Sequence, residues 1–105
     1  MLTGKQKHFL RGQAQTIKPL FHVGKGGLSD AFGIQVENAL QKRELVKVNI
    51  MPNADVTVQG LSDFMIKVDE RINIAQVIGH TVVFYQPSMK KENQKLSKQV
   101  KALLK

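Results

Sequence analysis

The chain has 105 residues, 42% of them hydrophobic, and a net charge of +8 at pH 7. This length fits one domain with a single modest core, and the hydrophobic share is typical of a globular protein. The sequence contains no cysteine, which excludes disulfides, thiol catalysis and cysteine-bound metals. It also lacks an apolar run near the ~20 residues of a membrane-spanning helix and an apolar signal core at its start, so we expect a cytoplasmic protein.

The positive charge is concentrated toward the two ends of the chain. Residues 1–27 contain five bases and no acid, residues 28–87 five bases and seven acids, and residues 88–105 six lysines and one glutamate. Basic ends around a slightly acidic middle indicate a localised contact with a polyanion rather than an evenly basic surface. Lysine used only for solubility is the alternative.

The first predicted elements are a helix, a short strand and a second helix. Thr3 and Gln6 have capping-box spacing, so a helix should run from residue 3 to about residue 14. Pro19 prevents its continuation, and residues 20–23 form a short, largely buried strand. After a glycine-rich stretch, Ser29 is a suitable N-cap for a helix that ends near residue 43.

The second half of the chain alternates in the same way and then forms a hairpin. Residues 45–50 alternate apolar and polar side chains, as in a strand, and apolar positions from 58 to 72 follow a helical stripe. Residues 73–78 and 81–86 are predicted strands joined by a type II′ turn at Gly79 and His80. Two strand–helix–strand crossovers should give parallel pairs, and the hairpin adds an antiparallel pair. The sequence therefore predicts a compact α/β domain of order α-β-α-β-α-β-β, with a four-stranded mixed sheet packed by helices.

Residues 88–105 are a lysine-rich helical candidate with a sparse apolar face. This segment could dock on the domain, bind a partner or fray in isolation. The pattern divides the chain into a domain over residues 1–87 and a basic helical tail over residues 88–105, whose removal should leave the domain folded.

The stretch from Gly24 to Gly27, with the sequence GKGG, lies between the first predicted strand and the second predicted helix. A strand that ends in a glycine-rich turn and continues as a helix presents backbone N–H groups to an anionic phosphate. The stretch does not match the Walker A pattern, and it is one glycine short of the dinucleotide-binding fingerprint. The local residues leave two interpretations open: a GxxG clamp for a nucleic-acid backbone, as in KH domains, or a plain tight turn with an incidental lysine.

Several short segments of the chain, taken together, match a known pattern. They are KQK at 5–7, IKP at 17–19, VGKGGLS at 23–29, AL at 39–40, ELVKV at 44–48 and VIGHTVVFYQP at 77–87. In this order they resemble the CRM domain family (chloroplast RNA splicing and ribosome maturation), in particular its stand-alone bacterial YhbY/YqeI-type members. The tail after Pro87 lies outside the family's core pattern, so its role cannot be carried over.

The resemblance implies an RNA-binding domain with a GxxG loop and a fold similar to the C-terminal domain of bacterial translation initiation factor three. Bacterial members of the family associate with precursors of the large ribosomal subunit, whereas plant relatives assist group II intron splicing. We therefore interpret the chain as a monomeric, non-catalytic RNA-binding protein in assembly of the large subunit, with ribosomal RNA or its precursor particle as partner. The alternative is an adaptor whose basic surfaces bind an acidic protein.

In this interpretation the loop glycines let the backbone meet phosphates, and a basic face extends the contact. That face includes the first helix, on the assumption that this helix packs near the loop. The expected RNA-binding residues are Gly24, Lys25, Gly26, Gly27, Lys5, Lys7, His8, Arg11 and Lys18. We expect no metal, cofactor, membrane or small-molecule ligand.

Most other candidate residues favour structural roles. The histidines are scattered without carboxylates at metal-ligand spacing, and helix capping accounts for Ser29 and Asp30 better than a nucleophile does. Asp69 and Glu70, followed by Arg71, are interpreted as a solvated helix end. No general acid–base pair is indicated.

Phe84 and Tyr85 alternate faces of the last predicted strand. One should lie in the core, and the other could stack on a base.

Overall fold

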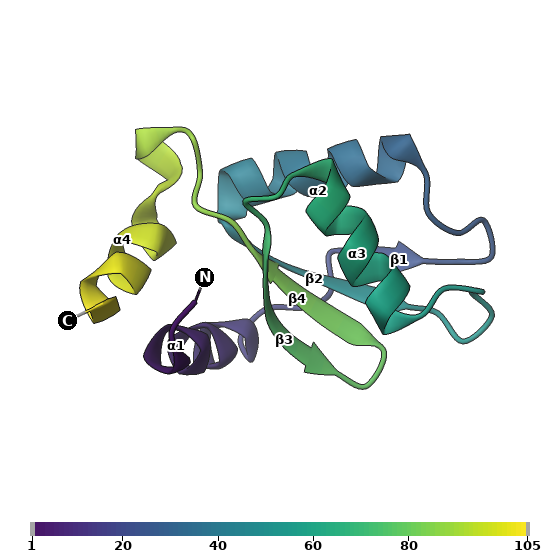
Figure 1. The fold of residues 1–105 in the computed structure, drawn as a ribbon, viewed down its shortest axis with the longest axis horizontal. Coiled ribbons are helices and arrows are strands. Elements are labelled where there is room, and N and C mark those ends of the chain that lie inside the picture. Colours follow the sequence, from purple (N-terminus) through teal and green to yellow (C-terminus); the bar gives the residue numbers. More distant parts are fainter. Residues whose placement is uncertain (1, 105) are drawn as a thin grey trace.

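The computed structural model describes residues 2–104 of the chain. Its elements in chain order are α1 (Gly4–Ala14), β1 (Phe21–Val23), α2 (Asp30–Arg43), β2 (Leu45–Ile50), α3 (Val58–Val68), β3 (Asn73–Ile78), β4 (Thr81–Tyr85), the 3₁₀ turn η1 (Lys91–Asn93), α4 (Lys95–Lys101) and the 3₁₀ turn η2 (Ala102–Leu104) (Figure 1). The hydroxyl groups of Thr3, Ser29 and Thr57 cap α1, α2 and α3 by accepting a backbone N–H bond from three residues further on. The predicted capping box of Thr3 with Gln6 and the predicted cap at Ser29 are confirmed.

The four strands form one mixed sheet in the order β1-β2-β4-β3. β1 and β2 are parallel, while β4 pairs antiparallel with both β2 and β3. The four-stranded mixed sheet is thus confirmed, but the second predicted parallel pair is wrong, because β4 inserts between β2 and β3. The burial of the two strands agrees with the central position of β4 and the edge position of β3. Residues 82–85 of β4 are all buried, as in a central strand, whereas Val77 and Ile78 are about half exposed on the edge strand β3.

Helices α2 and α3 cover one face of the sheet and enclose the larger apolar core. Leu40 of α2 and Met65 of α3 meet Phe84 of β4 there, and all three are fully buried. The two helices approach closely at Gly33, where a methyl group would lie 2.8 Å from Cγ2 of Val68. A glycine at this position therefore lets α2 pack directly on α3.

Helix α1 and the C-terminal α4 cover part of the opposite face and enclose a second core. This core contains Leu10 of α1, Tyr85 of β4 and Val100 of α4. The side-chain amide of Gln6 donates to the backbone carbonyl of Val100 at 3.0 Å in the protein interior. The chain thus has two cores, one on each face of the sheet, instead of the single core expected. The tail docks on the domain (Figure 1).

Glu44 joins this tail to the end of α2. It is fully buried and is the one non-glycine residue among residues 2–104 with a positive φ, 64°, which ends α2 in a left-handed turn. Its carboxylate accepts backbone N–H bonds from Ser88 at 2.6 Å, Leu96 at 3.1 Å and Ser97 at 3.0 Å. The bonds from Leu96 and Ser97 supply the cap that α4 lacks at its own N-cap residue. Burial, together with the neighbouring charge of Glu44, raises the pKa of Tyr85.

Some element boundaries differ from the predicted ones. β1 begins at Phe21, and Leu20 is 43% exposed, so the segment is less buried than expected. α3 ends before Ile72, which is buried but lies where the chain turns into β3. The turn before β4 has a positive φ, 56°, at Gly79 and not at His80, as a type II′ turn requires, and this prediction is confirmed.

Candidate nucleic-acid interface

The GKGG loop lies at one end of the molecule, where β1 ends and before α2 begins (Figure 1). Its two sides are anchored by Val23, which is buried, and by Leu28, which packs against the larger core. Between them the N–H of Gly27 donates to the carbonyl of Gly24 at 3.0 Å and closes a turn. Gly27 has a φ of 72°, a conformation that side chains rarely adopt. The loop is therefore a defined turn whose last glycine is required by its backbone.

Packing does not require the other two glycines, Gly24 and Gly26. A methyl group added at either position would meet no other atom within 4 Å. Gly26 and the neighbouring Lys25 are exposed to solvent. A molecule outside the protein can therefore approach this backbone without meeting a side chain, which is the property that a backbone clamp uses.

Ser29 and Asp30 follow the loop and begin α2. The hydroxyl of Ser29 accepts the N–H bond of Phe32 at 3.2 Å, and Asp30 in the first turn complements the helix dipole. Capping accounts for both residues, as predicted. Because the helix end already carries these groups, a phosphate at this loop would be held by the loop backbone and Lys25.

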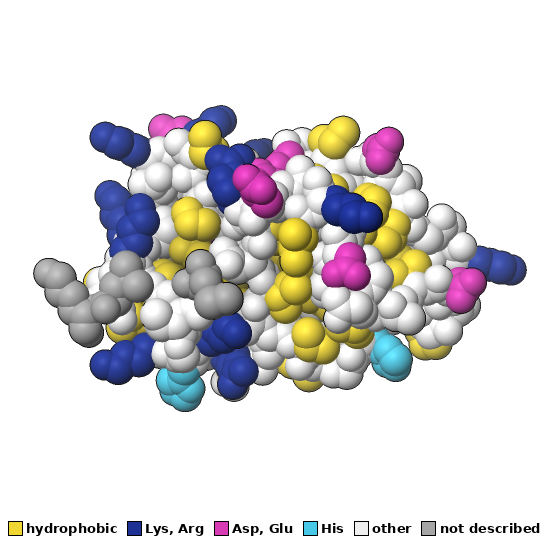
Figure 2. Space-filling view, viewed as in Figure 1, with side chains coloured by type: hydrophobic (Ala, Val, Ile, Leu, Met, Phe, Trp, Pro, Cys, Tyr) yellow, Lys and Arg dark blue, Asp and Glu magenta, His cyan; other side chains and the backbone are white. Residues whose placement is uncertain are grey.

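Much of the positive charge lies at the opposite end of the molecule from the loop. Helix α1 packs on β2, β3 and α4, and Figure 1 shows α1 and α4 at the left and the loop at the right. Lys and Arg side chains gather at the same left end in Figure 2. The assumption that the first helix packs near the loop is therefore wrong. The expected binding residues of α1, all exposed in this basic end, are Lys5, Lys7, His8 and Arg11.

An uncovered part of the sheet connects the loop with this basic end. The second core reaches Val83, and beyond it on the same face the strand register places His22, Asn49 and Thr81. Leu20 precedes them, level with Val83, because its N–H donates to Lys47, which pairs with Val83. Leu20 and His22 are exposed, and the hydroxyl of Thr81 donates to the side-chain oxygen of Asn49 at 3.1 Å. None of the four strands contains an acidic residue. We call Leu20, His22, Asn49 and Thr81 the open strip.

Lys18 lies between α1 and β1, next to the open strip, and its side chain is exposed. It lines a groove together with three cations that the sequence analysis did not single out: Arg43, Lys47 and Lys95. These three belong to the end of α2, to β2 and to the start of α4. Each of them carries only a local signal in the sequence, such as the alternation of Lys47 with the valines of β2, and Lys95 joins the other two only because the tail docks on the domain.

The aromatic residues of β4 are not available to a ligand. Phe84 is fully buried in the larger core, and Tyr85 is buried in the second core. The hypothesis that one of them stacks on a base is wrong, because helices cover both faces of the sheet at this end of β4.

The three histidines, His8, His22 and His80, are all exposed. Within residues 2–104 no group of three or more potential metal-ligating side chains comes together. The same part of the chain holds no helix with the length and apolar character needed to cross a membrane.

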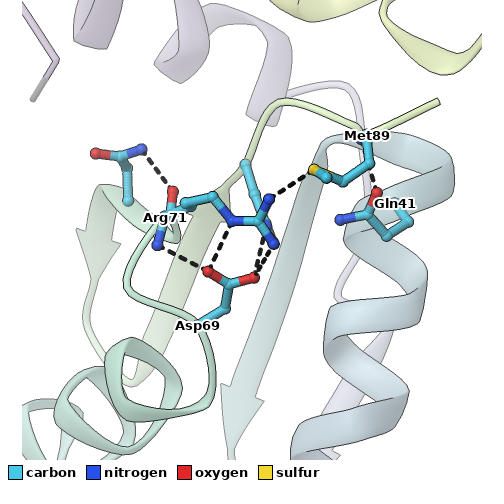
Figure 3. A network of polar contacts seen from close by, with 6 residues as sticks. Gln41, Asp69, Arg71 and Met89 are labelled. Atoms are coloured by element: carbon cyan, nitrogen blue, oxygen red, sulfur yellow. Dashed lines mark hydrogen bonds and ion pairs between the residues drawn. The ribbon is translucent and has the colours of Figure 1, made fainter. Parts of the chain in front are cut away.

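Asp69 and Arg71 form a polar cluster beside the start of the tail (Figure 3). The guanidinium of Arg71 donates to the Asp69 carboxylate through Nε at 3.0 Å and Nη2 at 2.6 Å, and the side-chain amide of Gln86 donates to it at 3.1 Å. The Arg71 hydrogen bonds hold the pKa of Asp69 well below its usual range, and a hydrogen bond shared with Asp69 raises the pKa of Glu37. The side chain of Asp69 is only 9% exposed, so the interpretation of this segment as a solvated helix end is wrong for Asp69.

Comparison with known proteins gives this arrangement a family context. The CRS1/YhbY (CRM) domain matches residues 2–86. The chain is similar to YqeI of Bacillus subtilis, named a probable RNA-binding protein, with 42% identity over 96 residues, which are 91% of this chain and 97% of that protein. It is also similar to an RNA-binding protein of Haemophilus influenzae, with 34% identity over 87 residues, 83% of this chain and 87% of that protein.

A solved structure shares the fold. The solution structure of SAV1595 from Staphylococcus aureus, a hypothetical protein with RNA binding as its suggested role, aligns with a TM-score of 0.64 and 36% identity. The alignment covers 87% of this chain and 94% of that one. Domain match, sequence relatives and fold agree: the chain belongs to the CRS1/YhbY (CRM) domain family.

Proposed function

We propose that this chain is a non-catalytic RNA-binding protein that holds an RNA backbone at the GKGG loop. Its membership of the CRS1/YhbY family and two relatives named for RNA binding support this function. The observation that carries the proposal is the loop. It combines a turn fixed by Gly27 with open space at Gly24 and Gly26 and an exposed Lys25.

The recognition chemistry follows from these groups. Backbone N–H groups and the Lys25 ammonium would meet phosphate oxygens, while the open strip offers polar side chains such as His22 and Asn49 to bases or riboses. The major groove of duplex RNA is too narrow for side chains, so the strip suits unpaired RNA. The basic end would add salt-sensitive affinity that tolerates many sequences.

We further propose that the RNA is ribosomal and that the protein acts in assembly of the large subunit in the cytoplasm, as a monomer. The resemblance to stand-alone bacterial family members, which associate with precursors of that subunit, supports this role. Domain match and relatives support RNA binding in general, whereas the role in the large subunit is supported by this resemblance alone.

Crosslinking in cells, followed by sequencing of the bound RNA and gradient sedimentation, tests this function. We expect large-subunit RNA to be enriched and the protein to sediment with immature particles. A parallel culture with Lys25→Ala should yield less crosslinked RNA at equal protein level, in line with a roughly threefold lower affinity. Recovery of the protein with an acidic protein partner and without RNA would contradict the proposal and favour the adaptor.

A further inference from the structure

A cationic groove lies where α1, the end of α2, β2 and the start of α4 meet. It has a volume of about 690 Å³. Four cationic side chains line it, and no acidic side chain does: Lys18, Arg43, Lys47 and Lys95. The amide side chains of Gln13 and Gln99 lie on the same walls and can donate further hydrogen bonds.

Within residues 2–104, none of the four groove cations forms a salt bridge. The carboxylate of Glu44, which follows Arg43 in the chain, is buried and already accepts the N–H bonds of Ser88, Leu96 and Ser97. Lys47 donates to the carbonyl of Ile17 at 3.0 Å, which orients its ammonium and leaves two of its three N–H donors for a ligand. Like charges brought together from separate elements favour a bound anion.

The groove is also continuous with the proposed RNA path. Lys47 and Leu20 line the groove and stand at the beginning of the open strip, since Leu20 pairs with Lys47 through its backbone N–H at 3.0 Å. From Lys18 the chain runs along β1 to Gly24, a span of at most about 20 Å at roughly 3.3 Å per residue. A single strand of RNA can therefore reach both places.

We propose that this groove is a second phosphate-binding site, which holds the backbone of the same RNA strand that the GKGG loop contacts. The inference rests on the proposed function and adds to it the residues Arg43, Lys47 and Lys95. It also gives the tail a role in RNA binding, because docking of α4 brings Lys95 to the groove wall.

The test measures binding of single-stranded RNAs from about 4 to about 16 nucleotides, the usual range of single-strand sites, by fluorescence anisotropy at several salt concentrations. The full chain is compared with the double variant Arg43→Gln/Lys95→Gln. The matched control is Lys98→Gln/Lys101→Gln, which removes the same charge from exposed positions of α4 that do not line the groove. Thermal unfolding of each variant verifies that it is folded.

We expect the groove variant to bind the longest RNAs about tenfold more weakly than the control variant does, which corresponds to two lost ion pairs. It should bind the shortest RNAs as the control variant does. For the long RNAs, the negative slope of log K against log salt should become shallower by about 1.4, because each lost phosphate contact removes roughly 0.7. Equal losses in groove variant and control, or the same loss at every RNA length, would overturn the second site.

Different results would contradict the groove site and the proposed function. If the unaltered protein binds none of these RNAs, RNA binding itself is contradicted, and the groove inference falls with it. If the protein binds RNA and Lys25→Ala weakens binding while the groove variant behaves like its control, only the groove inference is overturned.

Discussion

The two ends of the molecule are built on different principles. At the loop end, four consecutive residues form the whole feature, and its single lysine contributes little charge. At the basic end, Lys18, Arg43 of α2 and Lys47 of β2 meet through strand pairing, and Lys95 of α4 joins them only because the tail packs on the domain. Backbone geometry can thus be encoded locally, whereas a concentrated charge needs long-range packing. As long as the chain stays folded, we therefore expect loosening of the docked tail to lower affinity at the basic end but not at the loop.

Removal of residues 88–105 should have the largest effect and should unfold the chain. Val100 is buried in the second core and Leu96 is partly buried against it, and full burial of such a side chain contributes about 1.5–3 kcal/mol. Glu44 would also lose three hydrogen-bond partners in the interior. Together these losses approach the total stability of a small domain.

Circular dichroism during heating measures this effect on the truncated and full chains. We expect the truncated chain to show no cooperative transition above room temperature. A transition at an unchanged temperature would support the sequence-based expectation that residues 1–87 fold without the tail.

Glu44→Ala should be the most damaging single substitution at the basic end. It removes three charge-assisted hydrogen bonds and leaves buried N–H groups without partners, which should cost about 3 kcal/mol of unfolding free energy. Glu44→Gln keeps the shape and one acceptor oxygen, so it should lose about half as much. Urea denaturation measures both. Equal stability of the alanine variant and the original chain would show that the carboxylate does not hold the tail.

The sequence allowed most of the fold to be predicted because the relevant signals are local. Caps at Thr3 and Ser29, the alternation in β2 and the glycine turn before β4 each act within a few residues. The position of β4 between β2 and β3 could not be read from crossover rules, although its unbroken apolar run at 82–85 is typical of a central strand.

For the candidate site, the sequence predicted the loop but misplaced the basic residues. The turn depends on Gly27 and its neighbours alone, so the GKGG pattern was sufficient. The location of α1 depends on which face of the sheet buries Leu10, and that choice involves Tyr85 and Val100 far along the chain. The role of Glu44 was missed for the same reason, since its partners lie in the tail.

At the loop end, Gly27→Ala and Gly26→Ala separate turn geometry from backbone access. A side chain at Gly27 must adopt a φ of 72°, so this substitution should lower stability by about 1–2 kcal/mol. Gly26→Ala meets no atom within 4 Å and should leave stability within about 0.5 kcal/mol of the original. Both should weaken RNA binding, as measured by anisotropy. Unchanged affinity in Gly26→Ala would contradict a close approach of RNA to the loop backbone.

Lys25→Ala should have the smallest effect and gives the sharpest contrast between the two ends. The side chain is exposed, so we expect no change in stability. RNA affinity should fall roughly threefold, and the negative slope of log K against log salt should become shallower by about 0.7. Lys67→Ala, an exposed lysine of α3 outside the open strip, is the matched control. Glu44→Ala should leave the chain folded and weaken RNA binding at the basic end by loosening the tail. Because the loop lies at the opposite end of the molecule from the tail, combining Lys25→Ala with Glu44→Ala should multiply the two losses of affinity. A loss in the double variant no greater than that of Glu44→Ala alone would show that the loop contact also depends on the docked tail.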